Sequence, residues 1–365
     1  MNITNFLILV LAAALLIGCA APKPAVLPAD RSSPATALPD ASPSGEVLWP
    51  TSGWQVSTPE EQGMDPALLQ EMQADIQKQH LLLHSLLIIR HGQIVFEMYN
   101  PRYEQDTKHI LFSVTKSFVS TLAGIAFDQG KLKDLNQPVL DLLPGREFDN
   151  VDDRKRAMTV EHLLMMASGL DWVEGDPAYR MMYTSSDWVK AVMDLPMATE
   201  PGQTFVYCSG CSHVLAAIIQ QAVGQNLLDF AQQYLFEPLG ITDLRWEKDA
   251  QGLIIGGWGL YITPRDMAKL GYLYLHDGVW EGKQVLSSDW VQTATARHID
   301  GGDGYGYQWW TYATPNTYMA LGRAGQIIFV APDKDLIVVT TADMQEGHDP
   351  IYALIDNYIL PAVKK

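Results

Sequence analysis

Two pairs of short, apolar, β-branched runs, one near each end of the 365-residue chain, most strongly constrain the fold. Residues 86–90 and 94–99 flank His91-Gly92-Gln93, and residues 326–330 and 336–340 flank a Pro- and Asp-containing turn, so each pair predicts a β-hairpin. Apolar residues at helical spacing occupy 160–166, 213–223, 227–236, 264–276, 288–295 and 350–363. The pattern predicts an α+β fold, in which one antiparallel sheet from N- and C-terminal strands is flanked by helices and accompanied by a mainly helical region.

The N-terminal residues predict a targeting signal. An apolar run from Phe6 to Ile17 is too short to span a bilayer, which needs about 20 residues, but it suits a signal peptide. The residues that follow, Gly18-Cys19, complete a sequence that resembles the lipobox of bacterial lipoproteins. We therefore expect residues 1–18 to be a signal peptide and Cys19 to be lipidated, which would anchor the protein at the bacterial cell envelope. An uncleaved hydrophobic anchor is the alternative.

Residues 19–50 are expected to form a tether, because the stretch is rich in Pro, Ala and Ser and cannot bury a core. Residues 51–365 are then expected to form the globular domain. The formal charge of −17, from 25 basic and 42 acidic residues, disfavours binding to nucleic acid or to anionic lipid. We therefore expect a small-molecule partner, with membrane contact through the N-terminal lipid alone. The sequence does not indicate an oligomeric state.

Cys208 and Cys211 remain once Cys19 is assigned to the lipid. An oxidising envelope allows these two residues to form a disulfide, and two small buried thiols are the alternative. No second Cys or His pair in the sequence completes a zinc site, and the nine histidines lack metal-ligand spacing. We therefore expect neither a metal nor a cofactor.

Ser113 and Lys116 lie one helical turn apart where a buried helix is predicted to begin, so their side chains share a face. Apolar residues continue this helix from Phe118 to Ala126, and Gly130 ends it. A serine hydroxyl is a poor nucleophile, and a desolvated lysine whose pKa is lowered can take its proton. The pair therefore predicts a nucleophile and its base, at a helix start that favours negative charge. A serine N-cap beside a solvated lysine is the alternative.

Two other segments carry candidate site residues. Tyr207 precedes a helix predicted to start near His213, so its phenol can point into a cleft and, if nearby cations lower its pKa, carry protons. Gly322-Arg323-Ala324-Gly325-Gln326 leads into a strand, where glycine allows close approach to a ligand and a free N–H can bind an oxyanion. The alternatives are a core tyrosine and a solvated arginine.

Longer segments carry a family resemblance. They are FSVTKSF at 112–118, MTVEHLLMMASGLDW at 158–172, FEPLGI at 236–241 and GWGLYITPRDM at 257–267. With them the chain resembles the serine β-lactamase and penicillin-binding-protein superfamily over nearly the whole globular part. Within it, the chain is similar to the class C-like branch that holds family VIII carboxylesterases and 6-aminohexanoate-dimer hydrolases.

The resemblance assigns roles to the candidate residues. It implies that Ser113 is the acylated nucleophile, that Lys116 is its proton partner and that Tyr207 opens a Tyr-x-Asn motif. It also implies that the backbone N–H groups of Ser113 and Gln326 form the oxyanion hole. Tyr207 would return the proton to the leaving group.

The chain departs from the family pattern at two places. Ser209 stands where β-lactamases usually have Asn, and Arg323-Ala324 replaces Lys-Thr before Gly325. These departures favour ester or linear amide substrates over β-lactams. Arg323 is expected either to keep the Tyr207 phenol acidic or to steer a substrate carboxylate. Aromatic residues that could line a cleft, with core packing as the alternative, are Trp172, Tyr183, Trp258, Trp309 and Trp310.

We therefore expect a serine hydrolase that cleaves ester or linear amide bonds of small substrates through an acyl-enzyme. A β-lactamase or D,D-peptidase, and a non-catalytic lipid-anchored binding homologue, are the alternatives. The sequence lacks the Gly-x-Ser-x-Gly and His-Glu-x-x-His motifs of α/β-hydrolases and zinc proteases.

Overall fold

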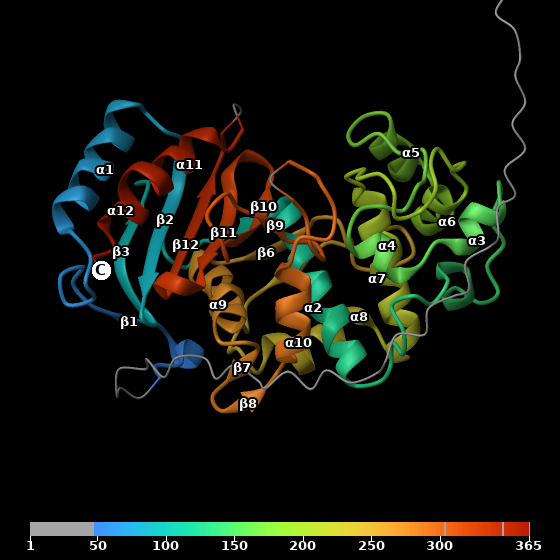
Figure 1. Cartoon of the computed structure of the whole chain (residues 1–365), viewed down its shortest axis with the longest axis horizontal. Helices are drawn as coiled ribbons and strands as arrows, with labels where there is room; N and C mark the ends of the chain where they lie inside the picture. The colour runs from blue at the N-terminus through green and yellow to red at the C-terminus, as the bar shows by residue number, and fades with distance from the viewer. Residues whose placement is uncertain (1–46, 303, 345–346, 365) are drawn as a thin grey trace, which may run out of the picture. The chain divides into compact units, whose positions relative to one another are not determined.

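The structure, a computed structural model, describes residues 47–302, 304–344 and 347–364 (Figure 1). The predicted signal peptide, Cys19 and the tether as far as residue 46 lie outside the described residues. The helices are α1 (Pro66–Lys78), α2 (Thr115–Asp128), α3 (Asp153–Ala157), α4 (Val160–Leu164), α5 (Ala178–Thr184), α6 (Trp188–Met193), α7 (Ser209–Val223), α8 (Leu227–Ala231), α9 (Pro264–Leu275), α10 (Ser288–Thr295), α11 (Asp349–Leu354) and α12 (Leu360–Ala362). The strands are β1 (Gln55–Val56), β2 (Leu83–Arg90), β3 (Gln93–Tyr99), β4 (His109–Ile110), β5 (Arg245–Trp246), β6 (Leu260–Ile262), β7 (Val279–Trp280), β8 (Lys283–Gln284), β9 (Trp310–Thr311), β10 (Tyr318–Gly322), β11 (Gln326–Ala331) and β12 (Leu336–Ala342).

The main sheet has seven strands in the order β1-β3-β2-β12-β11-β10-β9. Both predicted hairpins are present, and β2 pairs with β12, so strands from the two ends of the chain lie side by side. The predicted α+β class is confirmed. The predicted antiparallel sheet from N- and C-terminal strands is present, and the two-residue β1 is added to its edge in parallel with β3. Two smaller sheets, β4-β6-β5 and β7-β8, complete the strands.

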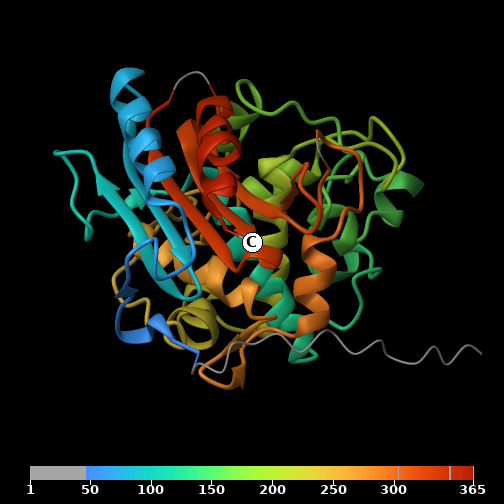
Figure 2. The ribbon, with the colours of Figure 1, turned by 60° about the vertical axis from the view of Figure 1, so that its left-hand side comes forward.

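Side chains of the main sheet alternate between two cores, as the pleat requires. On β2, Leu87 and Ile89 belong to the larger core, which α2, α7 and α9 share. Leu86 and Ile88 belong to a smaller core, to which α1, α11 and α12 also contribute. Figures 1 and 2 show α1, α11 and α12 together on this face of the sheet.

Helices α2 and α7 carry the predicted catalytic segments and pack against each other. Helix α2 is buried over most of its length and ends just before Gly130, whose φ is 66°. Helix α7 begins at Ser209 rather than near His213, because the Cys208 side chain caps it by accepting a hydrogen bond from the Cys211 N–H at 2.9 Å. Tyr207 therefore precedes the helix, as expected, with the N-cap Cys208 between them.

The described chain begins with residues that the sequence places at the end of the tether. Trp49 packs against Tyr272 and Trp280, with ring centroids 5.7 and 5.4 Å apart, and Pro50 is buried. The packed body therefore includes this tryptophan. Over the ranges that the structure describes, no helix is both long and apolar enough to cross a bilayer.

Candidate active site

Ser113 lies in a 3-10 turn that leads directly into α2. Phe112 has a φ of 45°, so the chain bends just before the serine. Strand β10 closes this turn from the other side: a Cβ on Gly322 would lie 2.3 Å from the Leu111 carbonyl oxygen. Glycine at position 322 therefore allows β10 to pack against the Ser113 segment.

Lys116 is the buried cation of the site, with 1% of its surface exposed. Its Nζ lies 2.9 Å from Ser113 Oγ, 2.9 Å from Ser209 Oγ and 2.7 Å from the Gly257 carbonyl oxygen. Burial lowers the pKa of Lys116 to about 7, and the nearby charge of Glu174 opposes that change. An amine with this pKa is largely neutral in mildly alkaline solution and can accept a proton from the serine.

Tyr207 contacts the same serine from the turn before α7. Its hydroxyl is hydrogen-bonded to Ser113, and its ring stacks on Trp310 with centroids 5.7 Å apart. The expectation that Arg323 keeps this phenol acidic is wrong: burial raises the pKa of Tyr207 above its ordinary value, and the charge of Glu174 raises it further. The phenol is therefore neutral near pH 7 and can donate its proton.

Glu174 is a functional candidate that the sequence analysis missed. Its carboxylate accepts hydrogen bonds from the Ser209 N–H at 3.0 Å and from the hydroxyls of Ser209 and Tyr179. It also accepts from Trp172 Nε1 at 2.7 Å. Glu174 is 35 residues from Ser209 in the sequence, so no short-range residue spacing predicts this contact.

A cleft of about 490 Å³ opens beside these groups. Polar, charged, aromatic and aliphatic residues and two glycines line it, namely Ser113, Glu174, Tyr179, Tyr207, Gly302, Trp310, Thr311, Met319, Leu321, Gly322, Arg323, His348 and Tyr352. Arg323 is exposed at the rim, and His348 Nε2 donates a hydrogen bond to the Gly322 carbonyl oxygen at 2.9 Å. A larger hollow of about 820 Å³ is lined by the C-terminal end of α2 and by the β7-β8 hairpin and contains none of the predicted catalytic residues.

Of the five aromatic residues predicted as cleft walls, the structure places one in the lining of this cleft. Trp310 lines the cleft, whereas Trp309 is fully buried in the core. Trp172 is buried, and its indole N–H donates a hydrogen bond to Glu174. Tyr183 is 61% exposed, lies outside the cleft lining and packs against Trp258, with centroids 6.1 Å apart.

Gly325 and Gln326 follow the exposed Arg323. Gly325 has a φ of 95°, and a Cβ there would lie 2.9 Å from the Ala342 Cβ, so this glycine packs toward β12. The Gln326 side chain is buried and donates hydrogen bonds to the carbonyl oxygens of Ala342 (2.8 Å) and Arg323 (3.0 Å). These contacts hold the turn between β10 and β11. The oxyanion role of the Gln326 N–H stays a prediction.

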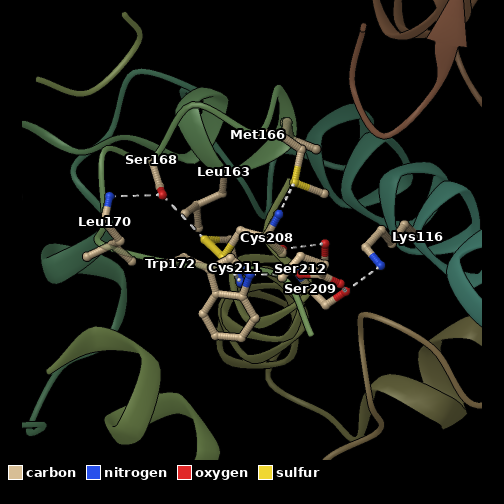
Figure 3. Close-up of a disulfide and its surroundings, with 12 residues drawn as sticks. Lys116, Leu163, Met166, Ser168, Leu170, Trp172, Cys208, Ser209, Cys211 and Ser212 are labelled. Carbon is tan, nitrogen blue, oxygen red and sulfur yellow. Dashed lines mark hydrogen bonds between the residues drawn. A yellow bond between two sulfur atoms is a disulfide. The ribbon is translucent and has the colours of Figure 1, made fainter. Parts of the chain in front are cut away.

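Cys208 and Cys211 form a disulfide with an S–S distance of 2.21 Å, which decides between the two alternatives left by the sequence. Figure 3 shows this bond at the start of α7, next to Ser209 and its contact with Lys116. The disulfide therefore links the two cysteines on either side of Ser209 and Gly210. Among the described residues, no three His, Cys, Asp or Glu side chains are grouped as a metal site.

Comparison with known proteins identifies the class. The chain belongs to the Beta-lactamase family, whose sequence model matches residues 67–354. It is 27% identical over 286 residues to the 6-aminohexanoate-dimer hydrolase of Paenarthrobacter ureafaciens, covering 70% of this chain and 71% of that protein. It is 28% identical over 179 residues to Esterase EstB of Burkholderia gladioli, covering 43% and 45%.

A solved structure shares the fold. The octameric penicillin-binding protein homologue from Pyrococcus abyssi matches with a TM-score of 0.65 at 19% identity, covering 82% of this chain and 78% of that one. The expected superfamily is thus confirmed, and the chain is a hydrolase of the serine β-lactamase-related class.

Proposed function

We propose that this protein hydrolyses ester or linear amide bonds of small substrates through an acyl-enzyme on Ser113. The observation that carries the proposal is the 2.9 Å contact between Ser113 Oγ and a buried Lys116 whose pKa is lowered to about 7. The pair opens onto a cleft large enough for a small substrate. Nucleophile, base and substrate space therefore occur together.

Acylation uses the proton acceptor at Lys116. Ser113 Oγ attacks the substrate carbonyl carbon while the neutral amine of Lys116 takes the hydroxyl proton. The carbonyl π electrons move to oxygen, and the backbone N–H groups of Ser113 and Gln326 stabilise this oxyanion. The oxyanion then re-forms the carbonyl, and the bond between the acyl carbon and the leaving group breaks. The neutral Tyr207 phenol gives its proton to the departing alkoxide or amine, and the protonated Lys116 replaces that proton.

Deacylation repeats these steps with water. Lys116, neutral again, takes a proton from a water molecule that attacks the acyl carbon. The second tetrahedral intermediate collapses, the bond to Ser113 Oγ breaks, and the serine recovers its proton. The products are a carboxylic acid and the alcohol or amine released earlier.

The substrate class follows from the altered motifs and from the relatives. Arg323 places a guanidinium at the rim of the cleft, where it can attract a substrate carboxylate. The similarity to a 6-aminohexanoate-dimer hydrolase supports linear amides, and the similarity to an esterase supports esters. Esters and linear amides that bear a carboxylate are therefore the substrates to test first.

A substrate panel tests this function. Wild-type protein, Ser113→Ala and the control Ser120→Ala, which changes another buried serine of α2, are assayed with a nitrophenyl ester, a linear aminohexanoate dimer and a chromogenic cephalosporin. We expect turnover of the ester or dimer by wild type and by the control, with loss in Ser113→Ala. Retention of activity by Ser113→Ala refutes the nucleophile, and turnover confined to the cephalosporin supports a β-lactamase.

We further propose that Cys19 carries a lipid that holds the protein at the cell envelope, as the lipobox-like sequence suggests. Wild type and Cys19→Ala are compared by detergent partitioning and by the intact mass of the N-terminal peptide. A wild-type peptide without added lipid mass contradicts the anchor.

A further inference from the structure

Glu174 lines the cleft, yet the proposed reaction gives it no role. Its carboxylate is surrounded by donors: Trp172 Nε1, the Ser209 N–H, and the hydroxyls of Tyr179 and Ser209. Indole and peptide N–H groups can only donate, so the Glu174 oxygen that receives both of them is an acceptor, and the Glu174 charge also acts on the nearby Lys116. The question is what this acceptor does to Ser209, which also contacts Lys116.

The carboxylate determines the direction of the Ser209 hydroxyl. A hydroxyl has one proton and two lone pairs, and an ionised carboxylate can only accept. The Ser209 proton therefore points to Glu174. The 2.9 Å contact between Ser209 Oγ and Lys116 Nζ must then use a lone pair of Ser209.

This direction in turn orients the base. A neutral lysine amine has two N–H bonds and one lone pair. The Gly257 carbonyl oxygen, 2.7 Å away, can only accept, so it takes one N–H, and Ser209 Oγ takes the other. The lone pair that remains is directed to Ser113 Oγ, at 2.9 Å.

We propose that Glu174 is a positioning residue of this hydrolase: by holding the Ser209 hydroxyl as an acceptor for Lys116, it leaves the amine lone pair free to deprotonate Ser113. The inference rests on the proposed acyl-enzyme mechanism and adds to it. The hydrogen bonds of this relay all point the same way: Lys116 donates to Ser209, and Ser209 donates to Glu174.

A glutamine at this position would reverse the polarity. The Glu174→Gln amide can donate to Ser209 Oγ, which frees the Ser209 proton to bind the Lys116 lone pair in competition with Ser113. The charge effect is separate. The Glu174 carboxylate opposes the burial that lowers the pKa of Lys116, so its removal lowers that pKa further.

The other groups around the Lys116 amine do not carry a charge that could replace that of Glu174. The Tyr207 ring centroid lies 4.8 Å from Lys116 Nζ, and its phenol is neutral. Helix α7 presents Ser209, and the segment before β6 presents the Gly257 carbonyl. Glu174 is the charge that acts on the pKa of Lys116 besides burial.

The test compares Glu174→Gln with Glu161→Gln. Glu161 is a matched control, because it is also half-buried and accepts a tyrosine hydroxyl, from Tyr307. The substrate is 4-nitrophenyl butyrate, which has no charge for Glu174 to bind directly. For Glu174→Gln we expect a kcat at least about tenfold lower, a KM within about twofold, and the acid limb of kcat/KM displaced to lower pH. Glu161→Gln should match wild type.

Making Glu174→Gln in a Ser209→Ala background separates the effect that passes through the Ser209 hydroxyl from the effect of charge on the pKa of Lys116. Without the hydroxyl, Glu174→Gln should change kcat by less than about twofold, because no proton direction remains to be set, whereas the limb should still move to lower pH. Ser209→Ala alone should lower kcat and leave the limb near that of wild type. Thermal unfolding and circular dichroism establish folding, and if Glu174→Gln does not fold, wild-type kcat in Ser209→Ala overturns the proposal.

The outcomes separate this proposal from the one on which it rests. If wild type is not labelled at Ser113 by a fluorophosphonate probe, the acyl-enzyme mechanism fails. If Ser113 is labelled and Glu174→Gln keeps the wild-type kcat and acid limb, the positioning role alone fails. A loss that appears only in KM, and only for cationic substrates, also overturns it, because Glu174 would then bind substrate.

Discussion

The pH dependence of kcat/KM tests the role of Lys116 most directly. The base must be neutral, so activity falls as the pH drops below its pKa. With the pKa of Lys116 at about 7, roughly half of the amine is neutral at pH 7 and about one tenth at pH 6. A solvated lysine, with a pKa near 10.4, would be neutral in only about one molecule in 25,000 at pH 6.

The magnitude of the limb follows from these fractions. We expect kcat/KM for an uncharged ester to rise about tenfold between pH 6 and pH 8 and to level off above pH 8, and its logarithm to reach a limiting slope of one only well below pH 7. Initial rates are measured from about pH 5 to about pH 9 in buffers of constant ionic strength, with stability checked at each pH. Lys116→Arg supplies the comparison, since a guanidinium stays charged throughout this range.

Two results would refute the assignment of the base. If kcat/KM is still rising steeply at about pH 9, burial does not lower the pKa of Lys116 as far as the proposed role requires. A limb near pH 7 with undiminished rates in Lys116→Arg would show that another group takes the serine proton.

Three further predictions concern residues around the catalytic groups. Gly322→Ala should lower the free energy of unfolding by about 1–3 kcal/mol and reduce kcat, because its Cβ would lie 2.3 Å from the Leu111 carbonyl oxygen; urea titration and ester assays check this. Replacing Cys208 and Cys211 together by Ser should cost about 2 kcal/mol in urea titrations, and reductant should abolish the difference from wild type. Arg323→Met should raise KM severalfold for substrates with a carboxylate and leave uncharged esters unaffected, because an exposed ion pair contributes at most about 1 kcal/mol.

The elements that could be predicted from the sequence are those with strong local patterns. The two hairpins have continuous β-branched runs around turn residues, and α2 has a long apolar stripe that Gly130 ends. The sequence pattern predicts the start of α7 too late, because Ser209 and Gly210 are poor helix formers, whereas in the structure the helix begins at Ser209 with Cys208 as its N-cap. Strand β1 has only two residues, too few for any periodicity.

The site was predictable where chemistry and spacing coincide along the chain, as at Ser113 and Lys116. Glu174 was missed because its function depends on contacts made only in the folded chain. The sequence favours Tyr183 as a cleft residue, but Tyr179, one helical turn earlier on α5, lines the cleft, because packing sets the rotation of this helix. The pKa of Tyr207 likewise depends on burial that no sequence neighbour reveals.

The interior position of Lys116 has a thermodynamic consequence. Because burial lowers the pKa of this lysine to about 7, the unfolded chain binds one proton more than the native protein at pH values between about 7 and about 10.4. The native state should therefore gain stability from this residue as solutions become more alkaline, which is the reverse of what an ordinary surface lysine in an ion pair produces. The Lys116→Met variant should lack this increase in the free energy of unfolding at alkaline pH. Unfolding experiments without substrate can therefore detect the buried amine.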